Sequence, residues 1–207
     1  MGARGRLITI EGVDGTGKTT LASALTGALA SRGVDATALR EPGGVELSER
    51  VRSLVKDPGL VVGDRAEALL YAAARAQLVE QALEPALASG RWLVLDRFVD
   101  SSLAYQGVGR GLGVKAVRDL NLFATGGLTP DRTLLLTLDQ AVARERAGAR
   151  GEELDRLELE GDAFFDAIAG GYLELAAASP ERIRVIDAGG SPEAVLAAAL
   201  AELDDLI

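Results

Sequence analysis

The chain has 207 residues, of which 48% are apolar, and this is enough for one domain with a sizeable core. It carries 22 Lys and Arg residues against 31 Asp and Glu residues, and the resulting net charge of −9 argues against a general nucleic-acid binder, which needs a basic face. It contains no Cys and no His, which excludes disulfides, thiolate zinc sites, thiol catalysis and imidazole bases. A polyanionic ligand must therefore meet a local basic pocket.

The first residues of the chain lead directly into a β-type pattern, with no apolar leader segment before it. No uncharged apolar run approaches the ~18 residues that a membrane span needs. We therefore expect a cytoplasmic protein that does not associate with a membrane.

Short β-type runs alternate with helical patterns along the chain. The β-type runs are residues 7–11, 36–40, 92–96, 133–138 and 184–187. Helical spacing covers residues 19–31 and a long Ala- and Leu-rich stretch at 64–88, and the segments 41–44 and 107–113 have the Gly and Pro content of loops. The run 92–96 is nearly all apolar, which is typical of a strand buried on both faces of a parallel sheet. The pattern predicts a single α/β domain over residues 1–207, with a three-layer open sheet of about five parallel strands and helices on both faces.

Residues 12–19 match the phosphate-binding pattern G-x-x-x-x-G-K-[ST], after a strand and before a helix. In such a P-loop the glycines let backbone N–H groups turn toward phosphate oxygens, and the helix N-terminus adds its positive end. Lys18 can reach the β- and γ-phosphates, and the Thr19 hydroxyl can bind Mg²⁺. The alternative, a glycine-rich turn with a chance lysine, explains neither the spacing nor the context. We assign ATP binding to Gly12, Val13, Asp14, Gly15, Thr16, Gly17, Lys18, Thr19 and Thr20.

Two acidic residues lie where the predicted strands meet the ligand. The Asp14 carboxylate would repel ATP if it pointed inward, so we expect it to face a second substrate, unless it only caps the loop. Asp96 and Arg97 follow the strand 92–95, at the edge of the sheet where ligands bind. Asp96 is a candidate for organising Mg²⁺ through water, and Arg97 for facing a phosphate. The alternative for this pair is a salt bridge at the strand end.

Tyr71 and Arg75 are four residues apart and occupy one face of the long predicted helix. An aromatic ring and a planar guanidinium on one face can stack on a nucleobase and hydrogen-bond to it, although such a pair is often only amphipathic packing. Arg40 and Glu41 follow the second predicted strand, and Arg52 lies on the next helix.

Five stretches, in this order, resemble bacterial thymidylate kinases over nearly the whole length of the chain. They are residues 11–20, 40–44, 71–75, 96–107 and 150–158. The P-loop alone identifies only a superfamily, whereas the ordered set is specific. The resemblance implies a P-loop kinase fold, transfer of the γ-phosphate of Mg·ATP to dTMP for dTTP biosynthesis, and a homodimer formed through apolar helices, with 64–88 as the expected contact.

The resemblance also implies roles for individual residues. The dTMP site would contain Asp14, Glu41, Arg52, Tyr71, Arg75, Arg97, Ser102, Tyr105 and Gln106. In it, Asp14 would hold the sugar 3′-hydroxyl, Arg52 and Arg97 the monophosphate, and Tyr71 and Arg75 the thymine, with Ser102, Tyr105 and Gln106 around base and sugar. The catalytic set would be Lys18, Asp96, Arg97 and Arg150, and Thr19 and Asp96 would serve Mg²⁺.

Two positions depart from the common family pattern. Phe98 replaces a Tyr and so lacks one hydroxyl donor, and Tyr71 stands where Phe is common. Both residues keep an aromatic ring, so we expect the activity to be modified and not lost. Gly15 occupies the place where some members carry a catalytic arginine. We therefore expect that arginine in a lid at about 143–158, where the arginines are Arg144, Arg146, Arg150 and Arg156. Arg150 fits the lid motif best, and the alternative for each is a solvated helix face.

The residue inventory agrees with a nucleoside monophosphate acceptor. A phosphate monoester has a second pKa of ~6, so it is largely ionised at pH 7 and needs no general base. Two alternatives stay open: another small P-loop kinase that acts on a different nucleotide or a small alcohol, and a nucleotide-dependent switch or binding protein. The N-K-x-D motif of guanine-specific switches is absent from the sequence.

Overall fold

The computed structural model describes residues 4–149 and 155–207. Within these ranges, five parallel strands form one sheet in the order β2-β3-β1-β4-β5. The strands are β1 (Leu7–Glu11), β2 (Ala36–Arg40), β3 (Trp92–Asp96), β4 (Arg132–Thr137) and β5 (Ile183–Asp187). The predicted parallel sheet is confirmed, and β4 and β5 each begin one residue earlier than the pattern indicated.

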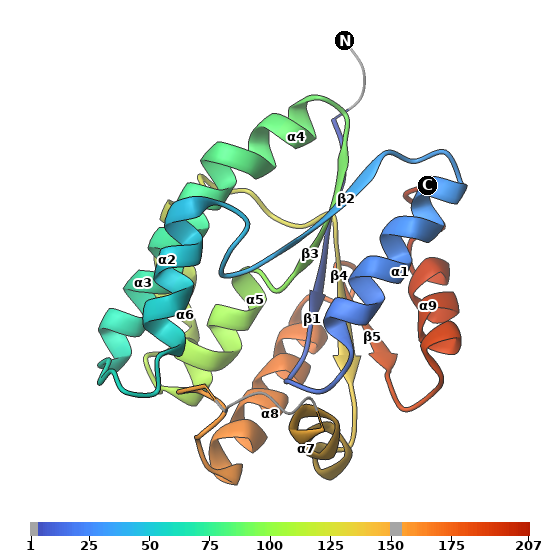
Figure 1. The fold of residues 1–207 in the computed structure, drawn as a ribbon. Helices are drawn as coiled ribbons and strands as arrows, with labels where there is room; N and C mark the ends of the chain where they lie inside the picture. The colour runs from blue at the N-terminus through green and yellow to red at the C-terminus, as the bar shows by residue number, and fades with distance from the viewer. Residues whose placement is uncertain (1–3, 150–154) are drawn as a thin grey trace.

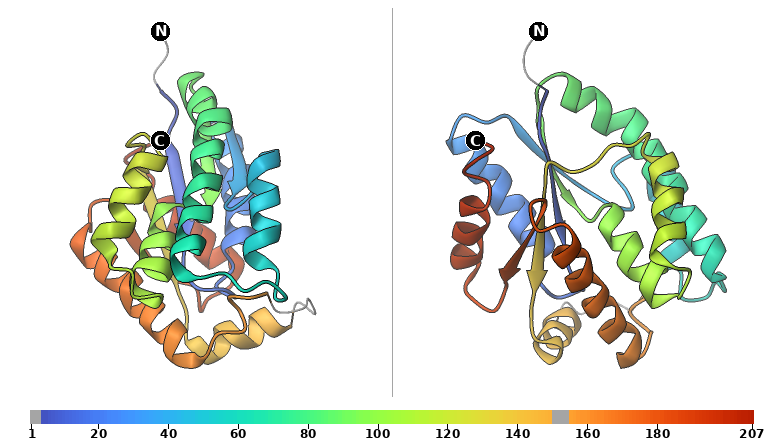
Figure 2. Two further views of the ribbon diagram at one scale, coloured as in Figure 1. Left: turned by 90° about the vertical axis from the view of Figure 1, so that its left-hand side faces the viewer. Right: turned by 180° about the vertical axis from the view of Figure 1, so that it is seen from behind.

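Helices cover both faces of this sheet, as predicted (Figures 1 and 2). One face carries α1 (Lys18–Ser31) and α9 (Pro192–Ala201), which pack against each other. The opposite side carries the remaining long helices, which are α2 (Glu46–Lys56), α3 (Asp64–Leu78), α6 (Val114–Ala124) and α8 (Asp162–Ala178). α2 packs against α3 within this layer.

The long helical stretch at 64–88 is also confirmed. It comprises α3, a π-helical segment η1 (Val79–Leu83) and α4 (Glu84–Ala88) without a break. Leu78, Leu83 and Leu87 are buried and pack with Leu7 and Leu93 of the sheet. The spacing of these leucines places them on one side of the helix, which explains why this stretch lies along the sheet.

Alternate residues of the strands face opposite helical layers. Ile8 and Ile10 of β1 pack with Leu25 of α1, whereas Leu7 packs with the leucines of η1 and α4. Val94 and Leu95 divide between the two layers in the same way. The central strands are therefore apolar on both faces, as expected for a parallel sheet between two helical layers.

The glycine-rich segment 107–113 is only partly a loop, and here the prediction was wrong. α5 (Val99–Ser102) continues into the π-helical segment η2 (Leu103–Gly109), so the loop starts after Gly109. A Cβ on Gly109 would lie 2.7 Å from Phe164 Cε2, and one on Gly107 would lie 3.2 Å from Val114 Cα. These two glycines therefore allow close packing of η2 against α6 and α8.

All strands run in the same direction, so the segments that follow them gather at one edge of the sheet (Figure 1). β1 lies between β3 and β4, and the chain reverses its direction of winding at this position. Ligands in open parallel sheets bind at such a reversal, beyond the carboxyl ends of the strands. No helix in the described ranges has the length and apolar character needed to cross a membrane.

Candidate active site

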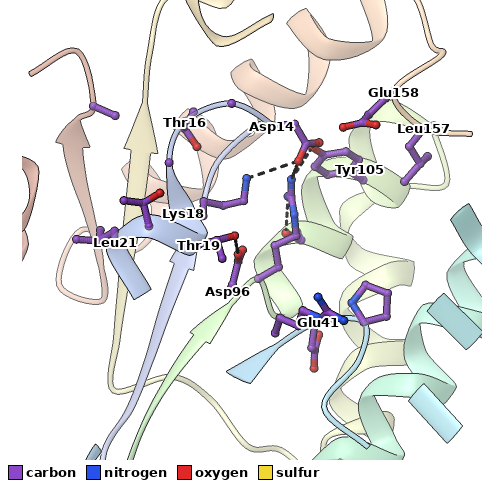
Figure 3. A pocket seen from close by; sticks show the side chains of 18 of the residues that line it. Asp14, Thr16, Lys18, Thr19, Leu21, Glu41, Asp96, Tyr105, Leu157 and Glu158 are labelled. Carbon is purple, nitrogen blue, oxygen red and sulfur yellow. Dashed lines mark hydrogen bonds and ion pairs between the residues drawn. The ribbon is translucent and has the colours of Figure 1, made fainter. Parts of the chain in front are cut away.

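A cavity of about 620 Å³ opens at this edge of the sheet (Figure 3). Its wall includes the P-loop after β1, the loop after β2, the residues after β3 and the loop between β5 and α9. α2, α3 and η2 close the other side. The P-loop and the acceptor-site residues predicted from the sequence therefore face one common space.

Side chains of the P-loop donate hydrogen bonds to the backbone of the same loop. Lys18 Nζ donates a hydrogen bond to Val13 O at 2.8 Å, and Thr16 Oγ1 donates to the same oxygen at 2.9 Å. Burial and the neighbouring Arg97 lower the pKa of Lys18 to about 8, although Asp14 and Asp96 act in the opposite direction. An anion beside Lys18 would raise this pKa again, because it favours the charged form.

Gly15 meets the backbone of α7 (Gln140–Gly148). Its φ is 84°, and a Cβ there would lie 1.9 Å from Ala143 O. A side chain at position 15 would therefore require α7 to move. The same helix contains residues 143–148 of the predicted lid, so this part of the lid is helical and packs on the P-loop.

Thr19 and Asp96 lie side by side between the P-loop and the end of β3. Thr19 Oγ1 donates to Asp96 Oδ2 at 2.5 Å (Figure 3). A hydroxyl and a carboxylate are the oxygen donors that Mg²⁺ takes when substrate phosphates and water complete its shell. These two residues fit the predicted metal role, and no group of three or more acidic side chains that could hold a metal occurs among the described residues.

Arg97 extends from the end of β3 toward the P-loop acid. Its Nη2 donates to Asp14 Oδ1 at 2.9 Å, and its guanidinium lies 5.0 Å from the centroid of the Tyr105 ring. Tyr105 OH also lies 3.4 Å from Asp14 Oδ2. The Asp14 carboxylate thus faces Arg97 and Tyr105, and its Oδ1 also lies 3.8 Å from Lys18 Nζ.

Arg75 is buried in a dense hydrogen-bond network. Its Nε donates to Glu41 Oε2 at 2.7 Å, its Nη1 donates to Ser102 Oγ at 2.9 Å and to Asn121 Oδ1, and its Nη2 donates to Phe98 O at 3.0 Å. Burial raises the pKa of Glu41 to about 7, although Arg75 opposes the shift. Glu41 Oε1 is buried without a hydrogen-bond partner in the described part of the chain.

Four other predicted acceptor residues also line the cavity, namely Arg52, Tyr71, Ser102 and Gln106. Arg52 Nη1 donates to Pro42 O at 3.0 Å, so the loop after β2 holds this arginine at the cavity. Gln106 Nε2 instead donates to the buried Glu67 at 2.8 Å, which places its amide against α3.

The lid arginines have different environments. Arg144 pairs with Asp162, Arg146 Nη1 donates to Ala188 O at 3.1 Å, and Arg156 Nη2 donates to Glu67 Oε2 at 2.6 Å. Of these three, only Arg146 lines the cavity. Arg150, the predicted catalytic arginine, lies outside the described residues.

The sequence interpretation missed two buried networks. Glu11 accepts hydrogen bonds from the hydroxyls of Ser101 and Tyr172 behind Arg97, and Glu67 pairs with both Arg110 and Arg156. Glu11 was visible only as the first residue of the P-loop stretch. No local pattern marked Tyr172, which lies on α8 far along the chain.

The comparisons with known proteins agree with this geometry. The family model described as "Thymidylate kinase" matches residues 10–199. A thymidylate kinase of Rhizorhabdus wittichii is 46% identical over 207 residues, covering 98% of this chain and 99% of that protein. Those of Chromobacterium violaceum and Deinococcus radiodurans are 50% and 47% identical, covering 89% and 90% of this chain and 87% and 90% of those proteins. The chain therefore belongs to the thymidylate kinase family.

Proposed function

We propose that this chain is a dTMP kinase, which transfers the γ-phosphoryl group of ATP to dTMP and gives dTDP and ADP. The observation that carries the proposal is one cavity with a P-loop on one side and Arg52, Arg97, Tyr71 and Arg75 on the other. Phosphoryl transfer needs the two substrates in line, and a shared cavity supplies that arrangement.

The donor nucleotide would lie along the P-loop and α1. Its phosphate oxygens would accept hydrogen bonds from the backbone N–H groups of residues 15–19, and Lys18 would neutralise part of their charge. Its base would extend toward Arg146, Gly190 and Pro192, which line the same end of the cavity. The hydrogen bond from Arg146 to Ala188 O holds the guanidinium at this end, where its flat face can stack on a base.

Thr19 and Asp96 would hold Mg²⁺ together with the ATP phosphates, with Asp96 acting directly or through water. When bound, this ion neutralises charge that develops on the phosphate oxygens. The protein contributes the fixed positions of one hydroxyl and one carboxylate.

The acceptor nucleotide would lie against α3, α5 and η2. Arg97 and Arg52 would bind its phosphate, and Asp14 and Tyr105 would bind the sugar at the other end of the Arg97 network. Tyr71 and Arg75 would face the thymine, with Arg75 held rigid by Glu41 and Ser102. A rigid donor of this kind discriminates between bases, because a base that cannot accept its hydrogen bond leaves it unpaired.

The reaction needs no general base. The acceptor phosphate is ionised near neutral pH, since its second pKa is ~6. The protein must bring two anions together, and two cations lie close to each other for this purpose: Lys18 Nζ and Arg97 Nη2 are 3.8 Å and 2.9 Å from the same oxygen, Asp14 Oδ1. We propose that a lid at about 143–158 adds Arg150 and excludes water from the cavity.

An acceptor panel tests this proposal. ADP release from Mg·ATP is measured with dTMP, dUMP, dCMP, dGMP and AMP in turn, at equal concentrations. We expect turnover with dTMP to exceed turnover with dCMP, dGMP and AMP by at least about a hundredfold. Faster turnover with one of those three would refute the base pocket, and tight ATP binding without any phosphorylation would favour a nucleotide switch.

We also propose a homodimer. α3 and α6 pack together, and both expose large apolar side chains, among them Leu69 at 57% and Phe123 at 88%. Burial of such side chains against a second copy is favourable. Sedimentation at micromolar concentration should show a dimer for the wild-type protein and a monomer for Phe123→Asp. A monomeric wild-type protein would contradict the proposal.

Because both substrates are charged nucleotides that do not cross membranes unaided, we propose a cytoplasmic location.

A further inference from the structure

Tyr172 is a buried tyrosine of α8 whose hydroxyl reaches the back of Arg97. Its side chain does not line the cavity, so it cannot touch a substrate there. We propose that Tyr172 is a positioning residue for the acceptor phosphate: its hydroxyl, together with Glu11 and Ser101, holds the Arg97 guanidinium in the orientation that binds this phosphate. This inference rests on the proposed dTMP kinase function.

The hydrogen bonds around Tyr172 form a closed set. Its hydroxyl lies 2.9 Å from Glu11 Oε2, 2.8 Å from Ser101 Oγ and 3.4 Å from Arg97 Nη1. Arg97 Nη1 also donates to Ser101 Oγ at 3.1 Å. One side of the guanidinium is thus fixed by two hydroxyls, while its Nη2 faces Asp14 and Tyr105.

Glu11 anchors this set from the end of β1. Its Oε1 accepts from the backbone N–H groups of Phe98 and Ser101, and its Oε2 accepts from the hydroxyls of Ser101 and Tyr172. Four donors around one carboxylate allow it to stay in place without exposure to water. Tyr172 uses its single proton for Glu11, so its oxygen is left to accept from Arg97.

The backbone of Arg97 shows why such support is needed. Arg97 has a φ of 71°, and it is the non-glycine residue with a positive φ among those that the structure describes. This conformation costs free energy in a residue with a Cβ, and it persists where the surroundings determine it. Glu11 binds the next backbone N–H group, that of Phe98, so the same carboxylate constrains both the backbone and the side chain.

Burial keeps the Tyr172 hydroxyl in its donating form. The side chain is 3% exposed, and burial together with the neighbouring Glu11 raises its pKa. Its ring contacts Tyr105 edge-on, with 6.4 Å between the centroids. Tyr172→Phe would therefore remove one hydroxyl and leave the packing of the ring, which makes it a specific probe.

The experiment compares binding of dTMP with binding of thymidine by calorimetry. These ligands differ only in the phosphate that Arg97 is proposed to bind. We expect Tyr172→Phe to weaken dTMP binding about fivefold, because it removes one support of a charged donor, and to leave thymidine binding unchanged. Steady-state kinetics should show a higher KM for dTMP and an unchanged KM for ATP.

Ser48→Ala is the matched control, since Ser48 Oγ is buried and donates to Ala74 O at 2.6 Å without lining the cavity. It should leave both affinities unchanged. If Tyr172→Phe does not fold, Ser101→Ala removes the adjacent hydroxyl from Arg97 Nη1 and is compared in the same way.

Two results would overturn the inference while leaving the kinase function intact. One is equal weakening of dTMP binding and thymidine binding, which marks a purely structural tyrosine, and the other is no change in the affinity for either ligand.

A double-mutant comparison uses the Arg97→Ala background, where Tyr172→Phe should have no further effect on dTMP binding. Wild-type protein that binds dTMP no more tightly than thymidine would refute the proposed acceptor site and this inference together.

Discussion

The two sides of the cavity present charge in different ways. The proposed donor side is a loop of backbone N–H groups with one lysine, and Lys18 lies within five residues of its hydrogen-bond partner Val13. The acceptor side is made of side chains from distant parts of the chain, such as Arg97 with Asp14 and Tyr172. A backbone site depends on local sequence, whereas a side-chain site depends on the whole fold.

The difference extends to the chemistry of the cations. Lys18 is a flexible ammonium whose pKa burial lowers to about 8, so its charge depends on what binds next to it. Arg75 and Arg97 are planar groups that remain charged and are fixed by several acceptors each. We infer that the donor side adapts to ATP and that the acceptor side is formed before dTMP arrives.

The largest expected effect is on stability, at Arg75. Arg75→Ala leaves Glu41 buried without its cation and removes the donor to Ser102, so we expect unfolding to require about 3–5 kcal/mol less free energy in urea titrations. Arg50→Ala is the control, because Arg50 and Glu46 are 77% and 80% exposed and should contribute almost nothing. Equal losses for the two variants would mean that the acceptor side is not a rigid network.

The next effect is on catalysis, at Lys18. Lys18→Ala should lower kcat by about a hundred- to a thousandfold, because it removes a buried cation from the transferring phosphate. The thermal midpoint should change little, since the hydrogen bond and the ion pair that the structure describes for Lys18 join it to Val13 and Asp14 of its own loop. Lys115→Ala, at an 89% exposed position on α6, should behave like the wild type. Unchanged kcat in folded Lys18→Ala would remove this lysine from the mechanism.

The smallest effect is a dependence of substrate binding on pH. The pKa of Lys18 is lowered to about 8 in the free protein, so the protonated fraction that binds ATP falls as the pH rises above this value. We expect the KM for ATP to rise about fivefold between pH 8 and pH 9, because the protonated fraction of Lys18 falls by that factor. The KM for dTMP should stay nearly constant over the same range, because arginine keeps its charge there. A parallel rise in both values would contradict the distinction between the two sides.

The fold and the position of the P-loop could be predicted from the sequence because their signals are local. Apolar runs of five residues and the spacing of the P-loop glycines are properties of short windows, and they placed β1, β3 and Lys18 correctly. The glycines at 107 and 109 were misread as a loop, because their role is to admit Phe164 and Val114, which lie elsewhere in the chain.

The acceptor network was only partly predictable for the same reason. Motif resemblance supplied Arg75 and Arg97, but it gave no information on what holds them. Glu11 and Tyr172 are 161 positions apart in the sequence, and only the fold brings them together. The buried Glu67 was missed in the same way, because its partners Arg110 and Arg156 come from two later segments.

The most direct test of this account is a crystal structure with dTMP and a non-hydrolysable ATP analogue bound together. The account predicts the triphosphate on the P-loop beside Lys18, the acceptor phosphate on Arg97, and Arg97 in the orientation it has without ligand. A monophosphate bound away from Arg97, or an Arg97 side chain that swings away from Tyr172 on binding, would contradict a preformed acceptor site.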